Sequence, residues 1–282
     1  MSAINKILLC FIAVIGFTIV SCDEVPVVIP MGPSGPTGPV DGDTTLRVVL
    51  MQELTGVKCP NCPTGAAEAK RLLQAFDEQL AVVAVHGDFL TTPLPESMYD
   101  FRTDFSRTIE SNTPFLGKPA AAINRRSFNG PPFLAYDVDD WESLILQELE
   151  SPADIKIEID ASESGGVLTV NVDFTPLIDL EGGYNVAVAL TQSGIEDVQE
   201  ENGNIIEDYE HEHVLRHMFT SALGDILGSD LAADLTISKE YSFTFPTDAS
   251  PAYDPAHLEI VAYVTRDGAA ETPVIQAAKA HL

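Results

Sequence analysis

The sequence predicts an α/β domain followed by an all-β sandwich domain, both placed behind an N-terminal export signal. Through about residue 150, short β-branched runs alternate with segments of helical spacing, a pattern typical of an α/β layer. Beyond Ser151-Pro152, hydrophobic residues recur at every second position, which indicates half-buried strands. We therefore expect two domains, residues 46–150 and 151–282.

The N-terminus carries the marks of secretion. Lys6 is followed by 14 uncharged, mostly apolar residues from Ile7 to Val20, whereas a membrane-spanning helix needs about 20. Residues 1–21 are therefore predicted to be a signal peptide that is removed. The segment Ile19-Val20-Ser21-Cys22 resembles a bacterial lipobox, and this resemblance implies a lipid on Cys22 that attaches the chain to a membrane. An ordinary secretory signal is the alternative.

Residues 22–45 are predicted to be a tether. The stretch from Gly32 to Pro39 has a Gly-X-Y look, but a collagen helix needs many more triplets, so a semi-extended spacer is expected. Without Lys6 the mature charge is 14 − 43 = −29, which argues against nucleic acid as a partner. We expect a solvated acidic face in the second domain, formed by Asp179, Glu181, Glu196, Asp197, Glu200, Glu201, Glu207 and Asp208.

The first domain is expected to contain three strands and three helices. Leu46–Gln52 and Ala81–His86 read as strands, and the region between Cys62 and Leu80 has helical spacing with Pro63 in the first turn. An amphipathic helix is predicted to start near Glu96. It is followed by a strand at 120–128 and by a helix behind Asp137, Asp139 and Asp140.

The second domain shows a period of two in five segments. Gly165-Gly166 and Gly182-Gly183 separate the first three segments as turn signals. This pattern predicts a β-sandwich of the immunoglobulin-like type. The alternating sets are Ile155/Ile157/Ile159, Leu168/Val170/Val172/Phe174, Tyr184/Val186/Val188/Leu190, Tyr241/Phe243/Phe245 and Leu258/Ile260/Ala262/Val264.

The chemistry is expected at Cys59-Pro60-Asn61-Cys62, between a predicted strand and a predicted helix. Two cysteines three apart at a helix start can form a disulfide without distortion. Backbone N–H groups and the helix dipole there stabilise a thiolate, which is the form that attacks disulfides. Lys58 adds a nearby cation. We expect Cys59 to be the attacking thiol, reachable by another protein, and Cys62 to be the resolving thiol.

This region resembles the thioredoxin superfamily. That resemblance implies a buried carboxylate six residues before the first cysteine, for which Glu53 stands at the right offset. It also implies a cis-proline that shapes the substrate groove, for which Pro119 is the first candidate and Pro114 the second. The sequence departs from the family pattern because Lys58 replaces the usual tryptophan and Pro-Asn replaces Gly-Pro. Reductase, oxidase and isomerase activities all remain open.

A longer part of the chain resembles the outer membrane protein 28 lipoproteins, which join a thioredoxin-like domain to a β-rich one. The matching stretches are Glu53–Gly56 running into Cys59–Pro63, then Ala84–His86, Pro119–Arg125 and Tyr209–Arg216. The resemblance implies an outer membrane lipoprotein that faces the periplasm or the cell surface.

The sequence gives weaker indications of a metal or haem site. Zinc commonly needs four ligands and haem attachment needs Cys-x-x-Cys-His, but Pro63 follows Cys62. His211, His213 and His217 are weak metal candidates, and a connector between strands is preferred for them, just as a core or rim position is preferred for His86. No cofactor is expected.

Two functions compete. In the first, a membrane-tethered thiol–disulfide oxidoreductase acts on protein thiols or disulfides through Cys59, Cys62, Glu53 and Pro119. In the second, a surface binding or adhesion lipoprotein keeps the thioredoxin-like fold as a scaffold, and a static disulfide staples the helix start.

Overall fold

The computed structural model describes residues 46–128, 133–267 and 272–282, which belong to one compact unit. The predicted signal peptide (1–21), Cys22 with its predicted lipid, and the predicted tether to residue 45 lie outside the described residues. None of the described helices combines the length and the apolar character that a membrane crossing requires.

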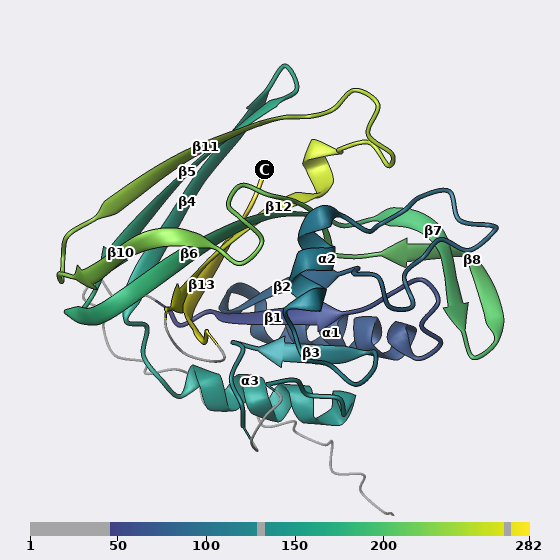
Figure 1. Cartoon of the computed structure of the whole chain (residues 1–282), viewed down its shortest axis with the longest axis horizontal. Coiled ribbons are helices and arrows are strands. Elements are labelled where there is room, and N and C mark those ends of the chain that lie inside the picture. The colour runs from purple at the N-terminus through teal and green to yellow at the C-terminus, as the bar shows by residue number, and fades with distance from the viewer. Residues whose placement is uncertain (1–45, 129–132, 268–271) are drawn as a thin grey trace, which may run out of the picture. The chain divides into compact units, whose positions relative to one another are not determined.

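An eight-stranded mixed sheet forms the centre of the described fold (Figure 1). Strands β1 and β2 are parallel, β3 is antiparallel to β1, and β2 continues into the rest of the sheet through a parallel bridge between Ala84 and Val214. The strand order is β13–β12–β6–β9–β2–β1–β3, with β10 also paired to β6. The bounds are β1 Val49–Leu54, β2 Leu80–Val85, β3 Ala120–Ile123, β6 Leu180–Gln192, β9 Val214–Met218, β10 Asp225–Leu231, β12 Leu258–Arg266 and β13 Val274–His281.

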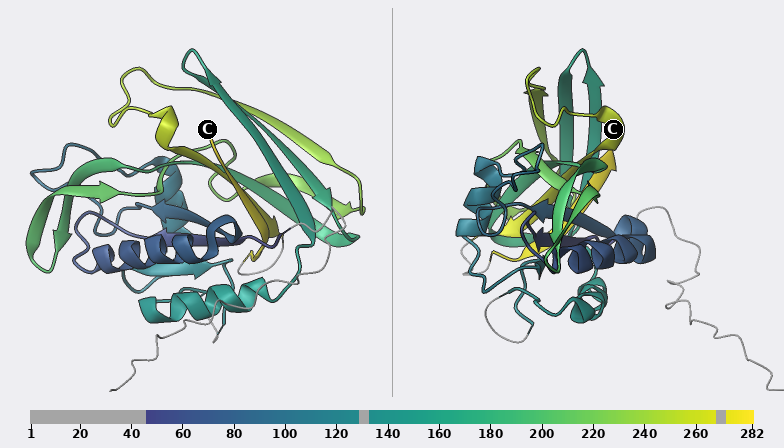
Figure 2. Two further views of the ribbon diagram at one scale, coloured as in Figure 1. Left: turned by 180° about the vertical axis from the view of Figure 1, so that it is seen from behind. Right: turned by 90° about the vertical axis from the view of Figure 1, so that its right-hand side faces the viewer.

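A smaller sheet packs against one end of the large one. It consists of β4 Ile155–Ser164, β5 Val167–Pro176 and β11 Ile237–Thr244 in the order β11–β5–β4. Alternate residues of these strands are buried against β6, β10 and β12, as the predicted period of two requires. Figures 1 and 2 show the two sheets facing each other as the layers of a sandwich.

Three α-helices cover the two faces of β1–β3. Helices α1 (Cys62–Phe76) and α3 (Trp141–Leu149) lie on one face, and α2 (Asp104–Ser111) lies on the other (Figure 2). Successive residues of β1 point to opposite faces, so both faces need apolar side chains. Short 3₁₀ turns occur at η1 Asp77–Gln79, η2 Val138–Asp140 and η3 Pro255–His257.

Most predicted boundaries shift by a few residues, and the largest differences occur at two elements. The helix expected near Glu96 begins at Asp104, where Thr103 and Ser106 form a capping box. The strand expected over 120–128 ends at Ile123 because Asn124 and Arg125 adopt positive φ angles of 46° and 50°.

A two-stranded hairpin stands apart from both sheets and was not predicted. Its strands are β7 (Ile195–Glu201) and β8 (Asn204–His211). The acidic residues of this stretch predict a solvated face, but Asp197 is fully buried. Its carboxylate accepts hydrogen bonds from the backbone N–H groups of Met98 and Tyr99, at 2.9 and 3.0 Å. The hairpin is therefore packed onto the loop that precedes α2.

The fold is mostly β, with mixed sheets. Strands from both predicted domains share one sheet and one core, in which residues of β1 and β2 pack against residues of β6, β9, β12 and β13. The boundary expected near residue 151 thus does not coincide with a break in the large sheet. The domain limits themselves remain predictions.

Candidate functional site

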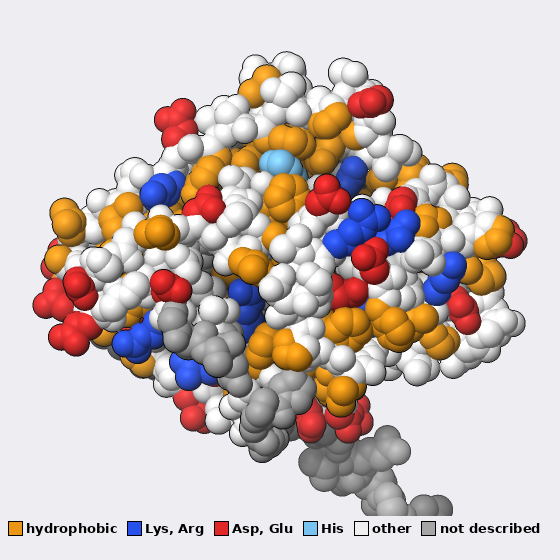
Figure 3. All heavy atoms as spheres, in the orientation of Figure 1, with side chains coloured by type: hydrophobic (Ala, Val, Ile, Leu, Met, Phe, Trp, Pro, Cys, Tyr) orange, Lys and Arg blue, Asp and Glu red, His pale blue; other side chains and the backbone are white. Residues whose placement is uncertain are grey.

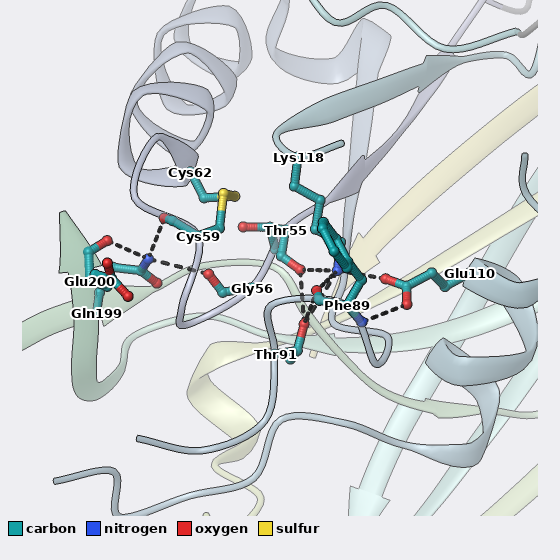
Figure 4. The surroundings of a disulfide bond; sticks show 10 residues. All are labelled: Thr55, Gly56, Cys59, Cys62, Phe89, Thr91, Glu110, Lys118, Gln199 and Glu200. Carbon is teal, nitrogen blue, oxygen red and sulfur yellow. Dashed lines mark hydrogen bonds and ion pairs between the residues drawn. A yellow bond between two sulfur atoms is a disulfide. The ribbon is translucent and has the colours of Figure 1, made fainter. Parts of the chain in front are cut away.

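Cys59 and Cys62 form a disulfide at the start of α1, with their Cα atoms 5.3 Å apart (Figure 4). A tight turn sets this geometry. The backbone N–H of Cys59 donates to the carbonyl of Gly56 at 3.0 Å, and that of Cys62 donates to the carbonyl of Cys59 at 3.2 Å. Pro63 occupies the first turn of the helix, where its missing N–H has no partner to lose.

Glu53 lies near the end of β1 with only 3% of its surface exposed. Its Oε1 atom has no hydrogen-bond partner among the residues that the structure describes. Burial disfavours the charged carboxylate and raises the pKa of Glu53 to about 8. Glu53 and Cys62 line the same cavity of about 20 Å³, together with His86, Tyr209 and His211. We call this space the inner cavity.

Gly65 brings the first turn of α1 against both Glu53 and Pro119. A Cβ atom on Gly65 would lie 2.9 Å from Glu53 Oε1, 2.9 Å from Pro119 Cβ and 3.1 Å from the Trp141 ring. The Lys118–Pro119 peptide bond is cis, and the bond before Pro114 is not among the cis bonds of the described residues. The sequence-based prediction did not include Gly65 among the site residues, although a glycine inside a helical pattern often indicates close packing.

Lys118, next to Pro119, ties the disulfide loop to α2. Its buried Nζ lies 2.5 Å from Glu110 Oε1 and donates to the carbonyls of Thr55 at 2.8 Å and Phe89 at 2.7 Å (Figure 4). Burial lowers the pKa of Lys118, and the hydrogen bond to Glu110 opposes that shift. This network fixes the loop after β1, which carries the cysteines.

The β7–β8 hairpin is hydrogen-bonded to the backbone of the disulfide turn. The amide of Gln199 donates to the carbonyls of Gly56 at 3.2 Å, Cys59 at 3.1 Å and Glu200 at 2.9 Å (Figure 4). The backbone adds two bonds, from Glu200 N–H to the carbonyl of Val57 and from Asn202 N–H to the carbonyl of Pro60. Cys59 is 0% exposed and Cys62 is 2% exposed. The expectation of a reachable Cys59 sulfur is therefore wrong for this conformation.

Lys58 and the three candidate histidines lie in different surroundings. Lys58 donates to Thr92 Oγ1 at 2.8 Å. His211 is buried with its ring tilted by 50° against that of Phe101, whereas His217 stacks on Phe243 with 3.9 Å between ring centroids. No group of three or more potential metal ligands with suitable geometry occurs in the described part of the chain. His213 lies at the junction of β2 and β9, apart from the other two.

A second hollow, of about 480 Å³, opens beside Pro119. Asn61 and Thr64 from the start of α1 line one side, and Tyr136 and Asp137 line the other. This hollow adjoins both the disulfide turn and the cis-proline. Acidic, basic and hydrophobic side chains are interspersed on the face seen in Figure 3, without a continuous basic patch over the part that is described.

A comparison with models of known protein families shows to which family the chain belongs. The model for outer membrane protein Omp28 matches residues 106–282, which is more than half of the sequence. The chain belongs to the Omp28 family. Membership makes it an outer membrane lipoprotein, in agreement with the location expected from the sequence.

Solved structures resemble this Omp28-family chain at low sequence identity. HBP35 of Porphyromonas gingivalis is 15% identical, with a TM-score of 0.66 over 85% of this chain and 77% of that one. A protein of Agrobacterium tumefaciens is 10% identical, with a TM-score of 0.52 over 84% and 95%. A domain of the outer membrane lipoprotein Omp28 of Porphyromonas gingivalis is 16% identical over 46% and 88%, with a TM-score of 0.33. Among curated protein sequences, none matched.

Proposed function

We propose that this outer membrane lipoprotein carries out thiol–disulfide exchange on protein substrates, using Cys59 and Cys62 within a thioredoxin-like domain. The observation that carries the proposal is the buried Glu53 Oε1, which lacks a hydrogen-bond partner among the described residues and borders the inner cavity with Cys62. A buried ionisable group without a partner destabilises the fold, so it is expected where its chemistry is needed. A purely structural disulfide has no use for it.

The steps follow from the positions of the groups. The reduced Cys59 thiolate attacks a disulfide of the partner and forms a mixed disulfide, releasing one partner thiolate. The Cys62 thiol gives its proton to Glu53, and the Cys62 sulfur attacks Cys59 Sγ, which releases the second partner thiolate. The partner gains two electrons, the cysteine pair loses two, and a donor dithiol must reduce the pair again. The reverse sequence oxidises a partner dithiol.

Pro119 and the hollow beside it are proposed to receive the partner. The resemblance to thioredoxins implies that an extended segment lies along the cis-proline, and the hollow of about 480 Å³ borders Pro119 and Asn61. The buried Lys118–Glu110 pair holds this wall in place. A rigid wall lowers the entropy lost when a segment binds.

Exchange requires the β7–β8 hairpin to leave Cys59. Its hold on the turn consists of the Gln199 amide and two backbone bonds. Each such bond contributes about 0.5–1.5 kcal/mol net, so a partner that forms its own bonds to the turn can displace the hairpin. The exchange site is then covered at rest and open when a partner is bound.

The direct test is reduction of insulin by the mature protein in the presence of a dithiol. The wild-type protein is expected to accelerate the reaction, and Cys59→Ser is expected to abolish the acceleration. A Ser162→Ala variant in the distant β4 strand is the matched control and should equal the wild type. Equal rates for the wild type and Cys59→Ser would remove the proposal.

A second function, a non-catalytic surface scaffold, is favoured by the complete burial of Cys59. Structural disulfides have potentials below about −300 mV and resist reduction. A titration against a glutathione buffer separates the two functions. Reduction well above that potential, with alkylation of both thiols under native conditions, supports exchange, whereas a resistant, unreactive pair supports the scaffold.

Attachment through Cys22 is part of the same proposal. Mass spectrometry of the chain from its native membrane is expected to find a lipid on an N-terminal Cys22. A Cys22→Ala variant should lose the lipid and be released from the membrane, and a variant that stays bound contradicts this anchor.

A further inference from the structure

Glu53 lies between two hollows. On one side is the inner cavity with Cys62, and on the other is a groove of about 370 Å³ that opens to solvent between α1 and strands β12 and β13. Ala66 borders both spaces and is itself partly exposed. The groove therefore gives Glu53 a route to water that does not pass the disulfide.

Ionisable side chains connect the floor of this groove to its rim. His213 Nδ1 lies 3.9 Å from Glu259 Oε1 and has no hydrogen-bond partner within the described part of the chain. Glu259 Oε2 lies 3.2 Å from Nε2 of His281, whose side chain is 74% exposed. From the inside outward, the acid–base groups are Glu53, His213, Glu259 and His281.

The backbone holds His213 at this point. Its carbonyl accepts from the N–H of Ala84 at 2.8 Å, and its N–H donates to Ser193 Oγ at 3.0 Å. His213 has a φ of 52°, in the left-handed region that non-glycine residues seldom adopt. Such a conformation persists only where the surrounding structure fixes the residue, as these two hydrogen bonds do here.

We propose that His213 and Glu259 carry protons between Glu53 and solvent through this groove, which makes them positioning and relay groups for exchange at Cys62. The inference rests on the proposed function. While the hairpin or a partner protein covers the disulfide, the proton that Cys62 releases needs another way out. The groove supplies that way on the far side of Glu53.

The proton balance is simple. Before Glu53 can accept the Cys62 proton, its own carboxyl proton passes to water in the groove and to the His213 imidazole. From His213 the proton reaches Glu259, then His281 and bulk solvent. No electrons move in these steps. Burial lowers the pKa of His213 to about 4, so at neutral pH the ring is uncharged and can both accept and donate.

Other charged groups also face Glu53 and His213. From the inner cavity these are His86, Tyr209 and His211. From the groove they are Lys70, Asp77, Glu212 and Lys279, and Lys70 pairs with Glu212 at 3.7 Å. Only the Glu259 carboxylate contacts both His213 and the exposed His281 among the described residues, so these three groups form the path from the groove to its rim.

The experiment follows oxidation of the reduced mature protein by excess oxidised glutathione between pH 6 and pH 9. Trp141 is the single tryptophan and packs against Gly65 at the start of α1, so its fluorescence reports the disulfide. The variant is His213→Asn, because asparagine tolerates a positive φ but cannot relay a proton. At pH 7 it should resolve the mixed disulfide about 10- to 100-fold more slowly than wild type. His257→Asn, at an exposed position outside the groove, is the control.

Two features separate a proton relay from a structural effect. Above pH 8, where Glu53 is already ionised, the rates of His213→Asn and wild type should converge, and at pH 7 added imidazole should restore the variant. Ala66→Leu, which fills the passage beside Glu53, should show the same convergence. Unchanged rates at pH 7, or a slowing that is equal at pH 7 and pH 9, overturn the route while exchange stands. A wild-type disulfide pair that never exchanges overturns the proposed function and the route with it.

Discussion

Two buried glutamates flank the disulfide loop, and they differ in what they touch. Glu110 is 6% exposed; its carboxylate pairs with Lys118 at 2.5 Å and accepts from the N–H groups of Asp88 and Phe89 at 2.7 and 2.9 Å. Glu53 is 3% exposed, but among the described residues its Oε1 has neither a cation nor a hydrogen-bond donor as partner. A buried carboxylate that supports structure is satisfied by donors, whereas one that exchanges protons is left able to change its charge.

The largest expected effect is a pH dependence of stability from Glu53. Its pKa is raised from 4.5 to about 8 in the folded protein. The folded state therefore holds the proton more tightly, and the stability that this contributes is complete below pH 4.5 and is lost as the pH rises through 8. The loss is about 5 kcal/mol. Urea unfolding at pH 5 and pH 9 measures it, and Glu53→Gln should remove most of the difference. An equally steep dependence in that variant would contradict the burial of an unpaired acid.

Breaking the ion pair between Lys118 and Glu110 should lower the free energy of unfolding by nearly as much. Glu110→Ala leaves Lys118 buried without its counter-charge and should lower the free energy of unfolding by about 3–5 kcal/mol. The double variant Glu110→Leu/Lys118→Met removes both charges and should lose less than Glu110→Ala alone. Chemical denaturation at pH 7 compares them, and a double variant that is the least stable of the set would show that the pair is not the source.

A smaller effect on stability is expected from the hydrogen bonds between the β7–β8 hairpin and the disulfide turn. Gln199→Ala removes one side chain that bridges the hairpin to the disulfide turn and should destabilise the protein by about 1–3 kcal/mol. It should also speed alkylation of the reduced cysteines, because Cys59 becomes easier to reach. Glu200→Gln, which keeps the backbone bonds, serves as the control. Identical alkylation rates in all three proteins would mean that the hairpin does not govern access.

The smallest effect is expected at Lys58. Its ammonium group is bound to Thr92 on the exposed side of the loop. Lys58→Met should change stability by no more than about 0.5 kcal/mol, and the alkylation rate of Cys59 should stay close to the wild-type rate. A marked drop in thiol reactivity would restore the sequence-based expectation that this cation primes the thiolate.

Local patterns were sufficient to predict part of the site and of the fold. The spacing of Glu53, Cys59 and Cys62 is a short-range property, and the structure places Glu53 and Cys62 on one cavity. The cis bond lies before Pro119, the first candidate that the resemblance supplied. Alternating residues marked β4, β5, β6, β11 and β12 because alternate residues of each strand face one shared core.

The remainder depends on contacts between distant parts of the chain. Gln199 reaches Cys59 across 140 residues of sequence, and its neighbours are acidic, so the local pattern indicated a solvated face. Glu110 and Lys118 look like ordinary surface charges until α2 and the disulfide loop are packed together. The single bridge between Ala84 and Val214 leaves no periodic signal, although it joins the two parts of the large sheet.

That bridge has a consequence for dissecting the protein. The side of β2 that pairs with β9 would become an open edge if residues 46–150 were produced alone, and every residue of β2 is apolar and buried in the whole chain. An exposed hydrophobic edge strand pairs readily with strands of other molecules. An isolated N-terminal fragment is accordingly expected to self-associate and precipitate, whereas the chain that keeps β9 stays dispersed.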